Sequence, residues 1–310
     1  MPPAAVTQRA ISGRGWLLFA LMCVIWGIPY LLIKVAVSDL SPAALVLART
    51  SIAALLLLPI AAARSELRPL LRHWAPLLAF AAIEIAIPWL LLGVAEQTIS
   101  SSLTGLLLAA IPLVSALIAR TTGARERLGL QNGLGLLLGV LGVAAIVGLN
   151  LEGAGVAPLA ALALVAICYA VGPVILQRYL SGLPALGVIA ASLGVTALVY
   201  APIAAFSWPE RLPRATVVGS VVALAVVCTA LAFLIFFALI AEIGPMRATL
   251  ITYVNPAVAA VLGVAILSEH FTIGMGVGFV FVLAGSVLAT RPAAKPAAPT
   301  SALEPAQDAL

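Results

Sequence analysis

Charged side chains are scarce in this chain. Asp, Glu, Lys and Arg together make up 9% of its 310 residues, whereas apolar residues make up 64%. A water-soluble domain carries about 25% charged residues, and no soluble fold of this length can bury so much apolar surface. The composition therefore excludes a soluble enzyme and predicts an integral membrane protein, because each membrane-spanning helix needs about 20 apolar residues.

Residue types that carry chemistry are equally rare. The chain has three cysteines and two histidines. Cys23, Cys168 and Cys228 all lie inside apolar runs without a CxxC pair, and His73 and His270 stand in separate loops. Metal-dependent or nucleophilic catalysis needs clusters that are missing here. We therefore expect no catalytic residue, metal or cofactor, and an intramembrane transferase is a remote alternative.

Ten apolar runs of membrane-crossing length follow one another, separated by short polar connections. Continuous Leu, Ala and Val runs predict helices, since the strands of a barrel would alternate in polarity. We expect an all-α membrane protein, with residues 1–15 as an N-terminal segment and residues 291–310 as a disordered tail. The predicted helices are 16–37, 42–63, 74–95, 100–119, 128–149, 155–177, 183–206, 215–241, 245–267 and 271–290.

Basic residues gather on one side of this topology. Of the 16 Lys and Arg residues, twelve fall at the termini and in the loops after even-numbered helices, and two fall in the opposite loops. Positive loops face the cytoplasm, so both termini are predicted to be cytoplasmic. The same bias accounts for the net charge of +5 without a nucleic-acid partner.

The chain matches itself at an offset of about 143 residues, which predicts two five-helix repeats, 16–149 and 155–290. An odd number of helices inverts the second repeat relative to the first. Inverted repeats are the usual basis of alternating access, with substrate bound near the midplane. The aligned pairs include Trp26 with Tyr169, Glu126 with Glu269 and, at 144 residues, Pro112 with Pro256.

Prolines and ionisable residues inside the predicted helices are the first candidates for a substrate site. A proline removes a backbone hydrogen bond and frees a carbonyl; Pro29, Pro88, Pro112, Pro173 and Pro256 lie deep in their spans. Charged groups in a membrane normally face water or a partner. Glu84 would contact a substrate ammonium or carry a proton. Arg49 would bind a carboxylate or lock its helix to neighbouring carbonyls, and Lys34 would bind substrate or snorkel to the interface.

Aromatic residues away from the membrane interface are the second group of candidates. Trp26 and Tyr169 occupy equivalent positions and could form opposite walls of a slot for an apolar or aromatic ligand, with tight core packing as the alternative. Asn255 could hydrogen-bond the ligand or join helices. The remaining candidates of this group are Tyr30, Trp89 and Tyr253.

Glycines spaced four apart mark the last helix of each predicted repeat. Gly135 and Gly139, and likewise Gly274 and Gly278, predict close helix packing, either as internal support or as a dimer surface. Glu126 and Glu269 precede these two helices. A negative charge stabilises a helix N-terminus, so both are interpreted as caps of the helices that follow them.

These features together resemble the drug/metabolite transporter superfamily, EamA type. The resemblance rests on Trp26-Gly27 with Pro29 and Lys34, on the prolines of helices four and nine, and on the two glutamates before glycine-rich helices. Within the superfamily the chain is most similar to bacterial YddG-type aromatic amino acid exporters. The resemblance implies a multi-pass protein of the bacterial inner membrane, with a central cavity that carries neutral or aromatic amino acids.

The sequence thus favours a secondary carrier of small amphipathic metabolites, embedded in the lipid bilayer as a monomer or a homodimer. A proton-coupled drug or metabolite efflux carrier is the alternative, and it would use Glu84 as the titrating carboxylate. A channel would need a ring of charges or a filter of repeated carbonyls, and neither pattern is found.

Overall fold

The computed structural model describes residues 11–121, 130–148 and 155–290, and within these ranges all regular secondary structure is helical. In the first half of the chain several membrane spans are built from two or more consecutive helices. They are α1 (Gly13–Ile25), α2 (Pro29–Ala36), α3 (Pro42–Ala63), η1 (Arg68–His73), α4 (Trp74–Phe80), η2 (Ala81–Ala86), α5 (Ile87–Thr98), α6 (Ser101–Leu108), α7 (Ile111–Thr121) and α8 (Leu130–Gly148).

The second half repeats this plan with fewer interruptions. Its helices are α9 (Val156–Tyr179), α10 (Ala185–Ala205), α11 (Ala215–Ala225), η3 (Val226–Leu231), α12 (Ala232–Ile243), α13 (Pro245–Ala248), α14 (Ile251–Leu267) and α15 (Ile273–Thr290). Nine helices of the described residues are long and apolar enough to cross a membrane, and α14, which follows α13, supplies the tenth predicted span.

The third span departs from the prediction. It was expected to end at residue 95, but the helical segment runs over Arg68–Thr98. Glu96, which the sequence placed in a loop, is therefore part of α5 and is fully buried. The expectation failed because a charged residue normally ends an apolar run, whereas here neighbouring helices cover it.

Of the five prolines predicted to interrupt their helices, three lie at an irregularity and two do not. The first span breaks between α1 and Pro29, the fourth breaks before Pro112, and Pro88 follows a stretch of π-helix, η2. By contrast, α9 continues through Pro173 and α14 through Pro256. In the ninth span the break lies earlier than expected, between α13 and α14.

The two halves carry the same local irregularity at equivalent places. The π-helices η2 and η3 have first residues 145 positions apart, and α3 and α10 have first residues 143 positions apart. A π-helix widens one turn, and such turns concentrate at functional sites. The inverted repeat is therefore visible in the backbone as well as in the sequence.

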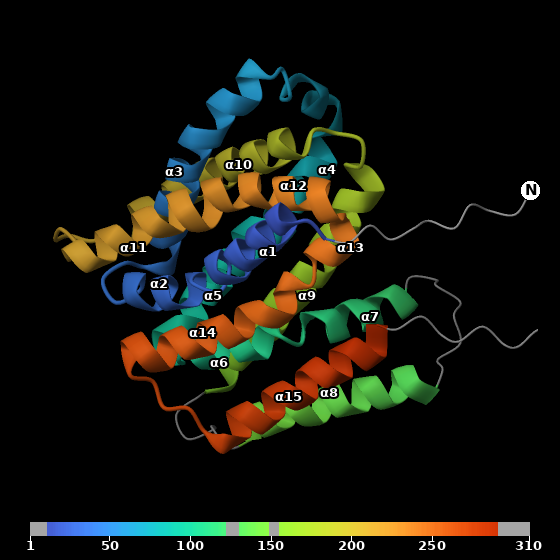
Figure 1. The fold of residues 1–310 in the computed structure, drawn as a ribbon. Coiled ribbons are helices and arrows are strands. Elements are labelled where there is room, and N and C mark those ends of the chain that lie inside the picture. The colour runs from blue at the N-terminus through green and yellow to red at the C-terminus, as the bar shows by residue number, and fades with distance from the viewer. Residues whose placement is uncertain (1–10, 122–129, 149–154, 291–310) are drawn as a thin grey trace, which may run out of the picture.

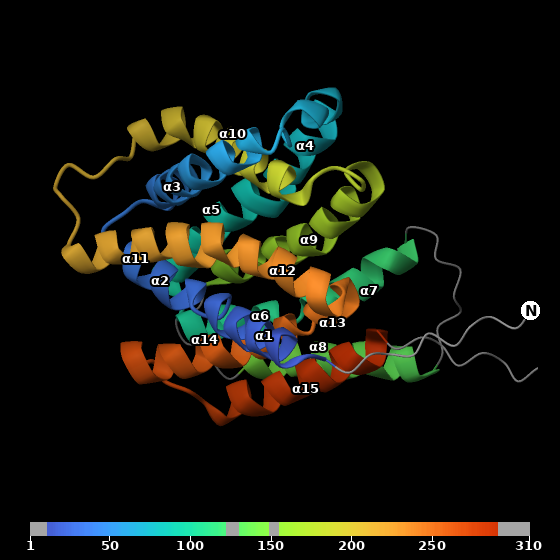
Figure 2. The ribbon, with the colours of Figure 1, turned by 45° about the horizontal axis from the view of Figure 1, so that its top comes forward.

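Helices from the two halves pack against each other in pairs. α3 packs along α10, and α8 packs along α15, as both views show (Figures 1 and 2). In the second pair a side chain at Gly135 would meet the backbone of Ala289, and one at Gly142 would meet the backbone of Val282. These glycine faces are thus buried between two helices of one chain, which confirms helix packing and removes them as a dimer surface.

Large apolar side chains cover the outside of the bundle as well as its core. Leu55 on α3 and Leu198 on α10 are about three-quarters exposed. Such a surface suits lipid and not water. We refer to the side of the membrane on which α1 begins as the N-terminal side, and to the other, on which α2 and α5 end, as the opposite side.

Candidate substrate site

Five of the predicted site residues meet where α2, α3, η2, α5 and α9 converge. Arg49 is their centre: its guanidinium lies over the Trp89 ring, 3.5 Å from the ring centroid. The hydroxyls of Tyr30 and Tyr169 interact electrostatically with Arg49, and Tyr169 interacts also with Glu84. One buried cation, one carboxylate and three aromatic rings therefore share one region of the bundle.

Arg49 is held in place by the second half of the chain. Its Nε donates a hydrogen bond of 2.9 Å to Oγ1 of Thr229 on η3, and that hydroxyl in turn donates to the carbonyl of Leu224. The residue is 7% exposed, and cation–π contact with Trp89 offsets part of its loss of water. None of the described residues accepts a hydrogen bond from its terminal amino groups. This leaves the fork of donors that binds a carboxylate in a bidentate manner.

Glu84 lies on the π-helix η2 and points at α9. A Cβ atom added at Gly172 would collide with Oε2 of Glu84, so the missing side chain of this glycine is what makes room for the carboxylate. Oε2 is buried and has no hydrogen-bond partner within the described part of the chain. This oxygen thus keeps its capacity to accept a hydrogen bond, and Tyr169 interacts electrostatically with both Glu84 and Arg49.

The repeat relates these two charges to each other. The offset of 143 residues between α3 and α10 takes Arg49 to Ser192, and the offset of 145 between the π-helices takes Glu84 to Thr229. Arg49 bonds to Thr229, whereas the hydroxyl of Ser192 is buried and has no partner within ranges 11–121, 130–148 and 155–290. Positions that the repeat makes equivalent therefore differ in charge. A cation, Arg49, lies beside η3, and an anion, Glu84, lies on η2.

Lys34 does not reach this site. Its ammonium donates hydrogen bonds to the carbonyls of Glu96 (2.6 Å) and Ile99 (2.8 Å) at the end of α5. The prediction offered substrate binding or snorkelling; the structure places Lys34 at a helix C-terminus, where a cation is favourable.

Trp26 also lies apart from the Arg49 centre. It packs on Phe236 and Phe233 of α12, with ring centroids 4.7 and 5.8 Å away. The indole packs in an apolar cluster with α12, whereas Tyr169 packs against a different cluster, so the structure does not bring Trp26 and Tyr169 together as two walls of a slot. Asn255, with its amide nitrogen as donor, bonds to the carbonyls of Cys23 (3.0 Å) and Ile251 (2.9 Å), and so joins α14 to α1.

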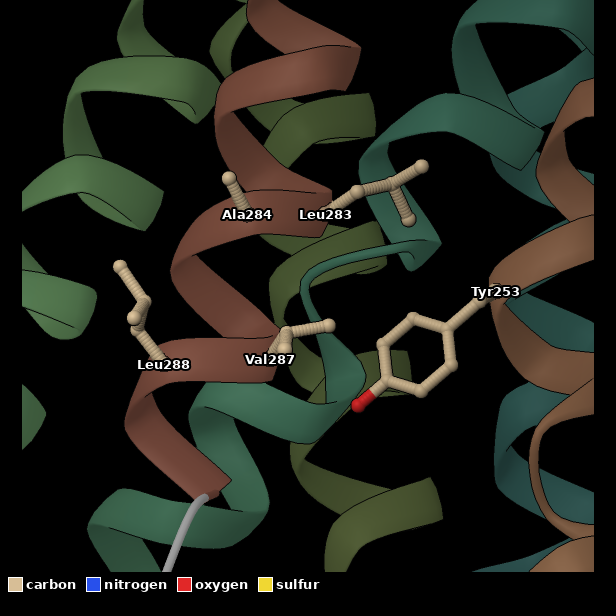
Figure 3. Close-up of a pocket in the computed structure, with 5 residues that line it drawn as sticks. All are labelled: Tyr253, Leu283, Ala284, Val287 and Leu288. Carbon is tan, nitrogen blue, oxygen red and sulfur yellow. The ribbon is translucent and has the colours of Figure 1, made fainter.

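Tyr253 faces a shallow, open pocket between α14 and α15 (Figure 3). The pocket has a volume of about 530 Å³, and its other lining residues are Leu283, Ala284, Val287 and Leu288 of α15. It lies on the N-terminal side of the bundle and is almost entirely apolar. Trp89, the other aromatic candidate, is not among its lining residues.

The opposite side is closed by hydrogen bonds that cross between the halves. The carboxylate of Glu269 accepts four of them, from the backbone N–H and the hydroxyl of both Ser101 and Ser102, at 2.5–3.0 Å. Glu269 therefore caps α6 of the first half. The prediction that it caps the helix after it was wrong, because the chain turns back between α14 and α15; Glu126 lies outside the described residues.

Close helix packing adds to this closure. On the opposite side α6 packs along α14, with Gly105 against Ala259. Farther out on the opposite side, Arg214 pairs with Asp39 at 2.7 Å and lowers the pKa of that carboxyl to about 2, so the pair stays charged at neutral pH.

Sequence reasoning missed three residues: Thr229, Ser192 and Glu96. Hydroxyl residues within apolar helices attract little attention, but the repeat offset applied to Arg49 and Glu84 would have identified the first two. Glu96 was dismissed as part of a loop. Among the described residues there is no group of three or more His, Cys, Asp or Glu side chains that could hold a metal ion.

Comparison with known proteins supplies the family. The model of the EamA-like transporter family matches the chain twice, over residues 13–148 and 157–291. No curated protein matches. Among the solved structures, one described only as the crystal structure of a protein is 20% identical, with a TM-score of 0.64 over 89% of this chain and 96% of the other. At this identity the likeness shows the fold alone.

Proposed function

The chain belongs to the EamA-like transporter family, and on this premise we propose that it exports aromatic or other neutral amino acids by alternating access. The family consists of membrane transporters of small molecules, not enzymes. The observation that carries the proposal is the pairing of a buried cation and a buried carboxylate around aromatic rings. Arg49 would bind the substrate carboxylate, Glu84 the ammonium, and Trp89, Tyr30 and Tyr169 the side chain.

The contacts between the halves on the opposite side support alternating access. The clamp of Glu269 on α6 closes that side. A carrier that alternates would have to release this clamp to open toward the opposite side. With the N-terminal side in the bacterial cytoplasm, as the positive loops suggest, the carrier would load substrate from inside the cell.

The test is uptake of labelled phenylalanine, tryptophan, threonine and a cationic dye into liposomes that contain the purified protein. We expect saturable uptake of phenylalanine and tryptophan, and competition between them. Uptake of the dye in place of the amino acids would contradict the proposal and favour drug efflux. Empty liposomes give the background, and Glu210→Gln, an exposed residue in a loop, serves as the matched control.

A further inference from the structure

Glu96 is the most deeply buried acidic residue of the described chain, and the substrate site does not use it. Its side chain is 0% exposed, and neither of its carboxylate oxygens has a hydrogen-bond partner among the residues that the structure describes. An ionised carboxylate in such surroundings would carry a large desolvation cost. The neutral form, with a proton on one oxygen, is the form that this environment favours.

A cation that could stabilise the ionised form lies close by but is otherwise engaged. The ammonium of Lys34 interacts electrostatically with Glu96, yet its two hydrogen bonds go to the carbonyls of Glu96 and Ile99. An ammonium has three N–H donors. Lys34 therefore has two alternative sets of partners within one helical turn: the backbone carbonyls while Glu96 is protonated, and the carboxylate once the proton has left.

Other charged and titratable groups around Glu96 oppose its ionisation or connect it to the substrate site. Glu269, from the turn between α14 and α15, interacts with it as a like charge. Tyr30 on α2 interacts with both Glu96 and Arg49. Among the neighbouring helices, α3 contributes Arg49, and α9 contributes Cys168 and Tyr169 toward the centre of the bundle. Lys34 is the cation of the described residues that interacts electrostatically with Glu96.

The position of Glu96 links its protonation to the closed side. Lys34 belongs to α2, the separate half of the broken first span, and Glu96 lies at the end of α5, just before the α6 terminus that Glu269 clamps. A change of partner by Lys34 would alter how α2, α5 and α6 are held together. Gain or loss of one proton would thus act on the contacts that must break for the carrier to open.

We propose that Glu96 is a proton-binding site that couples substrate movement to a proton gradient. This inference rests on the proposed function. It assigns proton binding to Glu96, whereas Glu84 binds the substrate. The proton binds Glu96 from the aqueous phase on one side and leaves to the other side when the closed contacts reverse. Nothing but water and hydronium is needed as a co-reactant.

The experiment compares exchange with gradient-driven accumulation in liposomes. Exchange of labelled for unlabelled phenylalanine at equal pH needs no proton movement. Accumulation of labelled phenylalanine driven by a pH gradient, whichever side is acidic, requires proton movement. For the wild type we expect both. For Glu96→Gln, which mimics the protonated acid, we expect exchange within about twofold of wild type and loss of accumulation; Glu210→Gln should keep both.

Three results would overturn the inference: no accumulation by the wild type under either gradient, accumulation that persists in Glu96→Gln, or accumulation lost in Glu84→Gln while that variant still exchanges. Absence of exchange in the wild type would instead reject the proposed function. Should Glu96→Gln fail to fold, the test is the internal pH of liposomes that contain the wild-type protein, measured with a trapped pH-sensitive dye. Phenylalanine flux should change the internal pH, and a constant internal pH would overturn the inference.

Discussion

The two halves of the molecule share a backbone plan but differ in charge at the place where they meet. Beside η3, Arg49 bonds to a threonine. On η2 the equivalent of that threonine is Glu84, and the equivalent of Arg49 is a serine whose hydroxyl has no partner in the described part of the chain. A duplicated fold with identical residues would give a site symmetric in charge. The observed difference gives a site with a positive and a negative end, which suits a zwitterion.

Removal of the positive end should have the largest effect. Arg49→Met keeps much of the side-chain volume but deletes the donors, and a hydrogen bond to a charged group contributes about 1.5–3 kcal/mol. We therefore expect phenylalanine to bind about 10- to 100-fold more weakly, as measured by equilibrium binding in detergent. Binding of phenethylamine, which has no carboxylate, should be little changed. Equal losses for both ligands would show that Arg49 is structural.

Removal of the negative end should have the next largest effect. In Glu84→Gln the ammonium of phenylalanine loses a charged acceptor, and we expect about 10-fold weaker binding. Binding of 3-phenylpropionate, which has no ammonium, should be unchanged or stronger. The same binding assay applies, and unfolding temperature and monodispersity of each variant exclude a folding defect. A loss of 3-phenylpropionate binding as large as that of phenylalanine would contradict the assignment.

Gly172→Ala tests the position of the Glu84 carboxylate without changing its charge. The new methyl group would collide with Oε2, and the carboxylate must turn away, because it is the free end of a flexible side chain. We expect a several-fold loss of phenylalanine binding with folded yield maintained. Gly194→Ala on α10, which has room apart from one contact of 3.3 Å with Leu58, is the control. Unchanged binding would mean that the observed position of Glu84 is not required.

The smallest effects are expected from the two hydroxyl residues, and they should differ. Thr229→Val removes the partner of Arg49, so the guanidinium loses one hydrogen bond and part of its orientation; we expect a loss of about fivefold, from about 1 kcal/mol. Ser192→Ala deletes a hydroxyl that has no hydrogen-bond partner among the described residues, and binding should change by less than about twofold. A larger effect at Ser192 than at Thr229 would reverse the comparison between the halves.

Much of the fold could be predicted from the sequence, because hydropathy, proline positions and an offset of about 143 residues are properties of the chain itself. Burial of Glu96 and the partners of Lys34 and Glu269 could not, because they depend on which helices pack together. The same holds for Trp26: its equivalence with Tyr169 in sequence is real, but the phenylalanines of α12 decide what it contacts. Arg49, Glu84 and Trp89 could be chosen as candidates from the sequence because ionisable and aromatic groups deep in a membrane need partners; their role in binding stays a prediction.

The most direct test of a site with one positive and one negative end is the binding of three ligands to the wild-type protein: phenylalanine, phenethylamine and 3-phenylpropionate. Each analogue lacks one of the two charged groups and keeps the aromatic ring. We expect phenylalanine to bind at least about 10-fold more tightly than either analogue, since only the zwitterion engages both Arg49 and Glu84. Equal affinity for all three ligands would contradict this account and leave the aromatic rings alone as the basis of recognition.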